Sequence, residues 1–188
     1  MPDRSPGPSN VMTAAHVPSD RRADDFVTIE IAKEAFNFSA GHFTMFSATE
    51  REDLHGHNWR VACEVTAPVG DAGLCFDYNI VKRRLMALIE SLDEKMLMPG
   101  ASPWLTMHEE GDYLVAHFAD EKIPFLPRDV LVLDVRNVSV EEMAGWILEQ
   151  LLADETIAAQ DLVALRVGVA SGTNQWGWRS WRTPGTSG

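Results

Sequence analysis

Apolar and polar residues alternate in several short stretches of the chain, a pattern typical of strands that bury one face. Val27, Ile29 and Ile31 alternate with polar neighbours, and a second apolar stretch runs from residue 35 to His42. Residues 104–109 and 113–118 flank Glu110-Gly111-Asp112, which predicts a hairpin with a tight turn. The same alternation predicts further strands over residues 55–66, 165–169 and 175–181, and a short apolar run predicts one over residues 130–135.

Two other stretches carry apolar residues at helical spacing. The first begins at Asp77, which is expected to be its N-cap, and runs to Leu92. The second runs from residue 140 to 153 and opens with Ser139-Val140-Glu141-Glu142, which fits a capping box. Helices and strands in this order predict an α+β fold, with two helices packed on one face of an antiparallel sheet.

The ends of the chain differ in composition from its middle. Residues 1–24 are rich in proline, glycine and serine without periodicity, which predicts a disordered leader. Residues 25–182 are expected to form a single domain, with the hairpin as an insertion over about residues 103–127. Residues 183–188 are expected to form a flexible tail.

Composition narrows the class of protein. The chain has 188 residues, 45% of them apolar, enough for a sizeable core, and its net charge is −12. An acidic protein is poorly suited to bind nucleic acid or an anionic membrane nonspecifically. No apolar run approaches the roughly 20 residues that cross a bilayer, and no secretory signal is evident, so a cytoplasmic protein is expected. Its two cysteines, Cys63 and Cys75, are expected to be reduced.

The strongest candidate for a functional site is the segment His55-Gly56-His57, at the start of a predicted strand. Side chains alternate faces along a strand, so both imidazoles point to the same side. His42 ends the preceding apolar stretch, and a hairpin would place it beside them. Three imidazoles form the kind of zinc site that leaves a fourth position open for chemistry. The alternative is a pair of surface histidines without a metal.

The segments Phe38-Ser39-Ala40-Gly41-His42 and Leu54-His55-Gly56-His57-Asn58 resemble the 6-pyruvoyl-tetrahydropterin and 6-carboxy-tetrahydropterin synthase superfamily. The resemblance runs from about residue 36 to 178. It implies a T-fold, a four-stranded antiparallel sheet with two helices on one face. It also implies Zn²⁺ held by His42, His55 and His57, a pterin-like small-molecule substrate, and a homo-oligomer, trimer or hexamer, with sites between subunits.

The chain departs from the family pattern at its proton carriers. Arg51 stands where the family usually has a cysteine, and a guanidinium cannot act as a base at neutral pH. Glu52 resembles a variant subgroup in which a glutamate replaces that cysteine, although Glu50 or Asp53 could take the same role. The family's Asp-His pair appears here as Asp93 and Glu94, which are expected to carry the second proton. The list of expected catalytic residues is therefore Glu52, Asp93 and Glu94.

Substrate contacts are less well defined. The glutamate that anchors the pterin in the family should fall near Val169, where no acid occurs. Ser139 and Glu141 remain as candidate substrate contacts, unless they only cap the helix. Other residues have both a functional and a structural interpretation: Trp176 and Trp178 as a stacking platform or as core, His108 and His117 as substitutes for the missing imidazole or as surface residues.

These observations favour a zinc-dependent lyase-like enzyme that acts on 7,8-dihydroneopterin triphosphate or a related dihydropterin by side-chain elimination or cleavage. Zinc would bind oxygens of the side chain and Glu52 would act as the general base. A product such as 6-hydroxymethyl-7,8-dihydropterin follows from the resemblance to the glutamate subgroup. The alternatives are a 6-carboxy-tetrahydropterin synthase, a zinc-holding family member that has lost catalysis, and a pocket recruited for another small molecule.

Overall fold

A long central strand organises the computed structural model, which describes residues 25–173 and 175–184. The predicted leader and residues 185–188 of the predicted tail lie outside the described residues. The main sheet has the order β10-β9-β3-β2-β4-β8, with β1 also paired to β3. Its strands are β1 (Phe26–Ile31), β2 (Asn37–His42), β3 (His55–Pro68), β4 (Lys95–Pro99), β8 (Val130–Leu133), β9 (Ala164–Ala170) and β10 (Trp176–Arg182).

Strand β3 is 14 residues long and therefore pairs with two different strands along one edge. Its first half pairs with β2, its second half with β1, and its other edge pairs with β9, all antiparallel. These strands and β10 form the expected T-fold sheet. Strands β4 and β8 extend it by parallel pairing, which the sequence analysis did not predict. Burial increases along residues 95–99 and does not alternate between the two faces. The segment therefore lacks the period-two pattern of apolar residues that predicts a strand.

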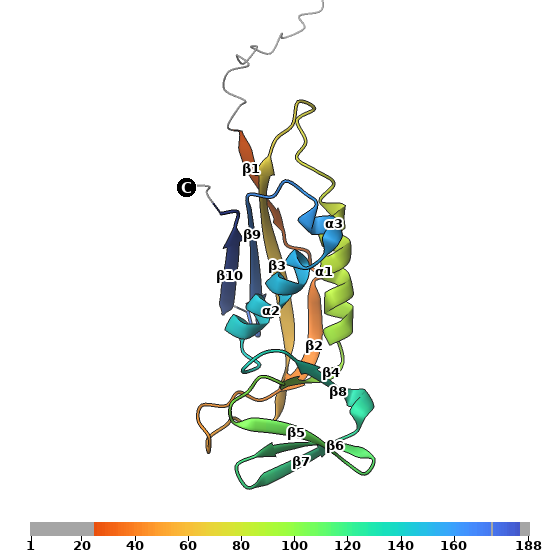
Figure 1. Cartoon of the computed structure of the whole chain (residues 1–188), viewed down its shortest axis with the longest axis vertical. Coiled ribbons are helices and arrows are strands. Elements are labelled where there is room, and N and C mark those ends of the chain that lie inside the picture. Colours follow the sequence, from red (N-terminus) through yellow and green to blue (C-terminus); the bar gives the residue numbers. More distant parts are fainter. Residues whose placement is uncertain (1–24, 174, 185–188) are drawn as a thin grey trace, which may run out of the picture.

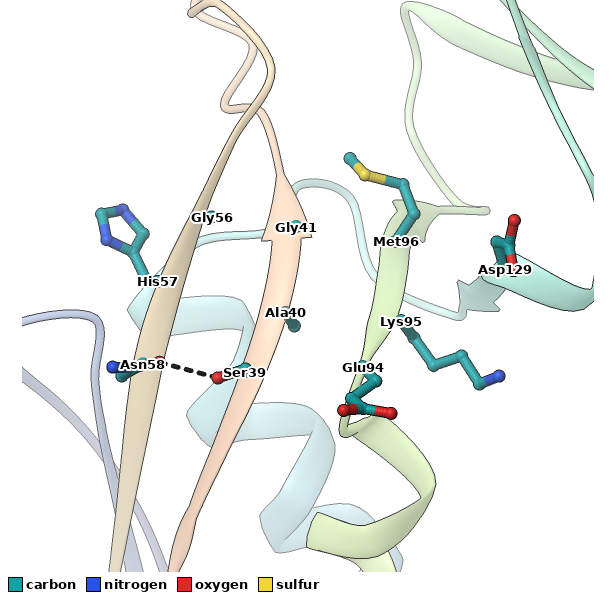
Figure 2. A pocket seen from close by; sticks show the side chains of 10 residues that line it. All are labelled: Ser39, Ala40, Gly41, Gly56, His57, Asn58, Glu94, Lys95, Met96 and Asp129. Atoms are coloured by element: carbon teal, nitrogen blue, oxygen red, sulfur yellow. Dashed lines mark hydrogen bonds between the residues drawn. The ribbon is translucent and has the colours of Figure 1, made fainter.

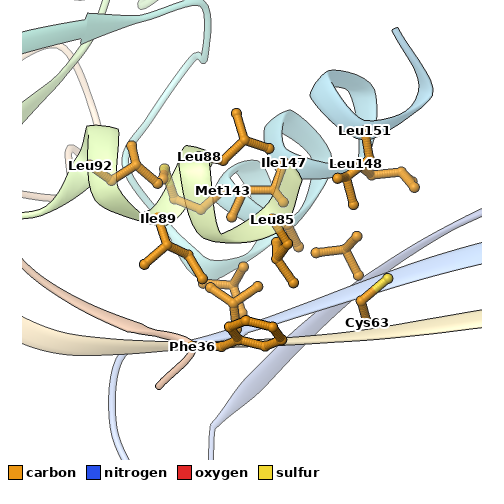
Figure 3. Close-up of a cluster of buried hydrophobic side chains, with 14 of the residues drawn as sticks. Phe36, Cys63, Leu85, Leu88, Ile89, Leu92, Met143, Ile147, Leu148 and Leu151 are labelled. Atoms are coloured by element: carbon orange, nitrogen blue, oxygen red, sulfur yellow. The ribbon is translucent and has the colours of Figure 1, made fainter. Parts of the chain in front are cut away.

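Helices α1 (Asn79–Leu92) and α2 (Val140–Leu152) cover one face of this sheet, as expected, and the short α3 (Glu155–Ala158) lies beside them (Figure 1). Leucines and other aliphatic side chains of both helices enclose a core with Phe36 and Cys63 from the sheet side (Figure 3). Full burial of each such side chain contributes about 1.5–3 kcal/mol, so the helix–sheet interface holds the fold together.

The N-cap predicted from the sequence is correct for α2 and one residue off for α1. Ser139 is the N-cap of α2 and accepts a hydrogen bond from the Glu142 amide, as predicted. The Glu142 carboxylate does not return to Ser139 but accepts from the Arg136 amide and guanidinium. The N-cap of α1 is Tyr78 rather than Asp77, and the Asp77 carboxylate accepts from the Asn79 amide.

The predicted hairpin is part of a separate three-stranded sheet, which we call the inserted sheet. Its strands are β5 (Leu105–Glu110), β6 (Tyr113–Phe118) and β7 (Glu121–Phe125), with Gly111 in the left-handed region at the tight turn. A 3-10 helix, η2 (Pro127–Asp129), leads back to β8. The inserted sheet lies beyond one end of the main sheet (Figure 1), where a second apolar cluster joins it to Phe43, Met45 and Met98. None of the described helices is long and apolar enough to cross a membrane.

Candidate metal centre

The pairing of β2 with β3 brings three histidines together. His42 lies directly opposite His55 in the antiparallel register, and His57 lies two residues farther along β3 on the same face. One ring nitrogen from each histidine forms a group in which these atoms lie within 4.8 Å of one another. The antiparallel pairing of β2 with β3 therefore produces the cluster of three histidines that was expected from the sequence.

In two of these histidines, Nδ1 is bonded to a backbone carbonyl, which leaves Nε2 available as a metal ligand. Nδ1 of His42 lies 2.9 Å from the Val138 carbonyl, and Nδ1 of His55 lies 2.7 Å from the Asp53 carbonyl. A carbonyl only accepts, so Nδ1 donates in each case and Nε2 keeps its lone pair. This is the arrangement that orients metal-binding histidines.

Two further observations test whether the cluster fits a metal ion. Nε2 of His42 is buried and has no hydrogen-bond partner among the described residues, which is costly unless a ligand satisfies it. Nε2 of His55 and Nε2 of His57 are 3.0 Å apart, close to the roughly 3.3 Å between nitrogen donors of a tetrahedral zinc ion. The residues present fit a metal ion with nitrogen ligands.

The electrostatic environment keeps two of these histidines, His42 and His57, in the neutral form that binds metals. Burial, followed by the effect of the neighbouring imidazoles, lowers the pKa of His42 from 6.5 to about 4. Burial and His55 also lower the pKa of His57. Both imidazoles are therefore neutral at neutral pH, as ligation requires.

Behind the histidines, Trp59 closes the site toward the core. Its side chain is fully buried, and its ring centroid lies 5.0 Å from that of His42 and 5.8 Å from that of His57. Phe38 stacks on Trp59 from the neighbouring strand, with centroids 5.9 Å apart. This rigid aromatic wall restricts the imidazole rotamers and excludes water from the core side.

A cavity of about 540 Å³ opens in front of the histidines, and Glu52 lines it. The Thr44 amide donates to Glu52 Oε2 at 3.0 Å, and the Glu52 amide donates to the Thr44 carbonyl at 2.8 Å. Partial desolvation tends to raise the pKa of Glu52, but the Thr44 hydrogen bonds, His55 and His42 outweigh it and leave this pKa below its ordinary value. Glu52 is therefore ionised at neutral pH.

The structure separates Glu52 from the two other acids considered for its role. Glu50 and Asp53 are exposed, and neither lines the cavity. Both predicted substrate contacts, Ser139 and Glu141, do line it, from the start of α2. Thr44 and a loop between β9 and β10 also line the cavity, and neither carries a motif in the sequence that predicts this role. The loop residues that line the cavity are Ser171, Gly172 and Gln175.

Asp93 and Glu94 are not part of this cavity within one chain. The Asp93 carboxylate accepts a hydrogen bond from the Ser39 amide at 2.7 Å, and the Glu94 amide donates to the Ser39 carbonyl at 2.8 Å. Glu94 instead lines a second cavity of about 580 Å³ with Lys95 and Asp129. Figure 2 shows Glu94 and Lys95 beside β4, across β2 from His57.

Other residues considered from the sequence lie elsewhere. Trp176 and Trp178 share a face, as predicted, with centroids 5.9 Å apart, and line a separate cavity. His108 and His117 contact each other on the inserted sheet, where His117 also contacts Glu110. Val169 is fully buried and no acid replaces the missing pterin anchor there.

Comparison with known proteins identifies the family of the chain. A family model described as 6-pyruvoyl tetrahydropterin synthase matches residues 30–178. The chain belongs to this family. A family member from Pyrococcus abyssi, provisionally named 6-carboxy-5,6,7,8-tetrahydropterin synthase, is 33% identical over 134 residues, which cover 70% of this chain and 78% of that protein. The synthase family thus includes relatives named for each of the two reactions.

Solved structures of family members share the fold. The 6-pyruvoyl tetrahydropterin synthase of Plasmodium vivax superposes with a TM-score of 0.79 at 24% identity, covering 85% of this chain and 100% of that chain. A P. vivax variant described as a catalytic-residue mutant, in which alanine replaces a glutamate, gives the same values. The T-fold expected for this chain is therefore confirmed.

Proposed function

We propose that this synthase-family protein is a zinc-dependent lyase that converts 7,8-dihydroneopterin triphosphate, or a related dihydropterin, by side-chain elimination or cleavage. The observation that carries the proposal is one cavity that holds the three imidazoles and the ionised carboxylate of Glu52. Family membership supports the pterin substrate class. The two unpaired cysteines support a cytoplasmic protein.

The metal would be held by His42, His55 and His57, in His42 and His55 through the ring nitrogens that the carbonyls of Val138 and Asp53 leave free. A zinc ion held there would supply Lewis acidity toward an oxygen of the pterin side chain. The cavity in front of the cluster leaves room for such a ligand. All three ligands project from paired strands, so the site needs little rearrangement to form.

Glu52 is the proposed general base. Its carboxylate is ionised and held by the Thr44 amide, so it is oriented before the substrate arrives. It would accept a proton from a carbon of the substrate side chain. The P. vivax relative in which a glutamate is described as a catalytic residue supports this assignment.

Ser139 and Glu141 are the proposed substrate contacts. Both line the same cavity from the first turn of α2. The Ser139 hydroxyl already accepts from the Glu142 amide, whereas Glu141 is exposed and its carboxylate can accept from a guanidine-like pterin edge. We therefore assign ring recognition to Glu141 and positioning of the helix start to Ser139.

Asp93 and Glu94 are the proposed second proton carriers, and they would act on the site of a neighbouring chain. Within one chain they lie away from the cavity that contains Glu52. A homo-oligomer, a trimer or hexamer with sites between subunits, would allow them to reach another copy's substrate. Sedimentation of the purified protein tests this part of the proposal.

A 6-carboxy-tetrahydropterin synthase is the second candidate, favoured by the name of the P. abyssi relative. The deciding experiment incubates zinc-loaded protein with 7,8-dihydroneopterin triphosphate and identifies the products by mass spectrometry. 6-Hydroxymethyl-7,8-dihydropterin supports the Glu52 mechanism, whereas 6-carboxy-tetrahydropterin with acetaldehyde supports the second candidate. The absence of turnover at full zinc content would refute both and favour a pocket that has lost pterin chemistry.

A matched pair of variants tests the role of Glu52 directly. Glu52→Gln removes the proposed base at nearly constant volume, and we expect it to reduce turnover at least about 100-fold while zinc content stays at the wild-type level. Glu50→Gln is the control, because Glu50 is exposed and lies outside the cavity. Equal activity of the two variants would refute the assignment.

A further inference from the structure

The segment that carries Glu52, residues 43–54, rests on the inserted sheet. Phe43 and Met45 at its start are 1% and 2% exposed and belong to the apolar cluster that includes Leu105 and Phe118 of the inserted sheet. The Asn137 side chain donates to the Met45 carbonyl and accepts from the Met45 amide. The first half of this segment is thus fixed by packing and by a side-chain clamp.

Arg51 ties the second half of the segment to the same sheet. Its guanidinium contacts Glu121 at the start of β7, with Nε and Nη2 at 2.7 and 2.6 Å from Glu121 Oε2. Its Nη1 donates to the backbone carbonyl of Glu52 at 2.7 Å. The guanidinium carbon also lies 4.9 Å from the centroid of the Phe43 ring.

These contacts hold the Glu52 backbone from two sides. Arg51 forms an isolated antiparallel bridge with Met45, and the Glu52 amide donates to the Thr44 carbonyl. The Arg51 guanidinium holds the carbonyl of Glu52 itself. Because the Thr44 amide also holds the Glu52 carboxylate, a shift of this backbone would move the carboxylate relative to the three imidazoles.

We infer that Arg51 is a positioning residue that couples the inserted sheet, through Glu121, to the placement of Glu52 in the metal cavity. The inference rests on the proposed function of Glu52. A planar guanidinium can hold a carboxylate and a carbonyl at once through separate N–H groups, which a lysine ammonium cannot do with the same fixed geometry. The Arg51 side chain is 17% exposed, so this geometry is partly shielded from water.

Arg51 thus has a function of its own, which is to position Glu52. Arg51 does not line the cavity, and its side chain extends to the inserted sheet instead. The base and its support are then neighbours in the sequence, with Glu52 facing the cavity and Arg51 facing away from it. The inserted sheet becomes part of the catalytic apparatus although none of its residues lines the cavity.

The first test measures steady-state kinetics of Glu121→Gln, Arg51→Lys and the double variant with the zinc-loaded protein. A small displacement of a base costs mainly turnover, so we expect kcat to fall about five-fold in Glu121→Gln and about 20-fold in Arg51→Lys, with KM within about two-fold. The double variant should be no slower than Arg51→Lys, because Glu121 acts through Arg51. Additive losses, or losses confined to KM, would overturn the inference.

The second test measures hydrogen–deuterium exchange over residues 44–54 and requires no activity. We expect exchange in this segment to be about five-fold faster in Glu121→Gln and Arg51→Lys, at unchanged zinc content. Glu110→Gln is the matched control, because Glu110 pairs with Lys122 and His117 inside the inserted sheet. Unchanged exchange, or an equal effect of the control, overturns the inference. Faster exchange without pterin turnover supports the coupling while refuting the proposed function.

Discussion

The metal-free protein should lose stability in mild acid because it buries His42 in its neutral form. The pKa of His42 is about 4 in the folded chain, whereas an unperturbed histidine, as in the unfolded chain, has a pKa of 6.5. Between these values the unfolded chain binds a proton that the folded chain does not. The contribution of His42 to the free energy of unfolding is therefore fully present above about pH 6.5 and is lost as the pH falls through 4.

The size of the effect follows from the same two values. One pKa unit corresponds to about 1.4 kcal/mol, so the interval from 6.5 to about 4 corresponds to about 3 kcal/mol. This is a large share of the roughly 5–15 kcal/mol that stabilises a typical domain. With a urea dependence of about 2 kcal/mol per molar, the unfolding midpoint should fall by about 1.5 M from this residue alone.

The assay is urea unfolding of chelator-treated protein between pH 7 and pH 4, for the wild type and for His42→Gln. The variant cannot gain a proton at this position, so its stability should fall less over this interval, by up to about 3 kcal/mol. His117→Gln is the control, because its imidazole is on the inserted sheet beside Glu110. Parallel pH curves for the wild type and His42→Gln would refute the argument.

Three further outcomes follow from the same structure. His55→Ala should sharply lower the zinc content measured by elemental mass spectrometry, whereas His108→Ala should leave it unchanged; equal contents would contradict the three-histidine site. Burial, then Glu64, raises the pKa of Cys63 to about 12, so a thiol reagent at pH 8 should label one cysteine, Cys75, in the folded chain and two in urea. Leu85→Ala should reduce the free energy of unfolding by about 2–5 kcal/mol without changing zinc stoichiometry, because Leu85 is fully buried between the helices and the sheet, away from the metal site.

Local patterns in the sequence determined much of this protein. Alternation placed His55 and His57 on one face of a strand, because successive side chains of a strand point in opposite directions. The helical spacing of α1 and α2 identified the faces that are buried. The order of elements then predicted the helix-covered antiparallel sheet, and the resemblance to the synthase family predicted its T-fold.

The tertiary structure decided what depends on contacts between distant segments. The resemblance to the glutamate subgroup favoured Glu52 but left Glu50 and Asp53 open, and the Thr44 hydrogen bonds and the cavity single out Glu52. The sequence could not show that Asp93 lies away from Glu52, because Asp93 is held by the amide of Ser39, 54 residues away in the chain. The pairing of Arg51 with Glu121 spans 70 residues and arises only when the inserted sheet packs beneath residues 43–54. Periodicity describes one element at a time, whereas a site is built from several elements whose relative positions are set by packing.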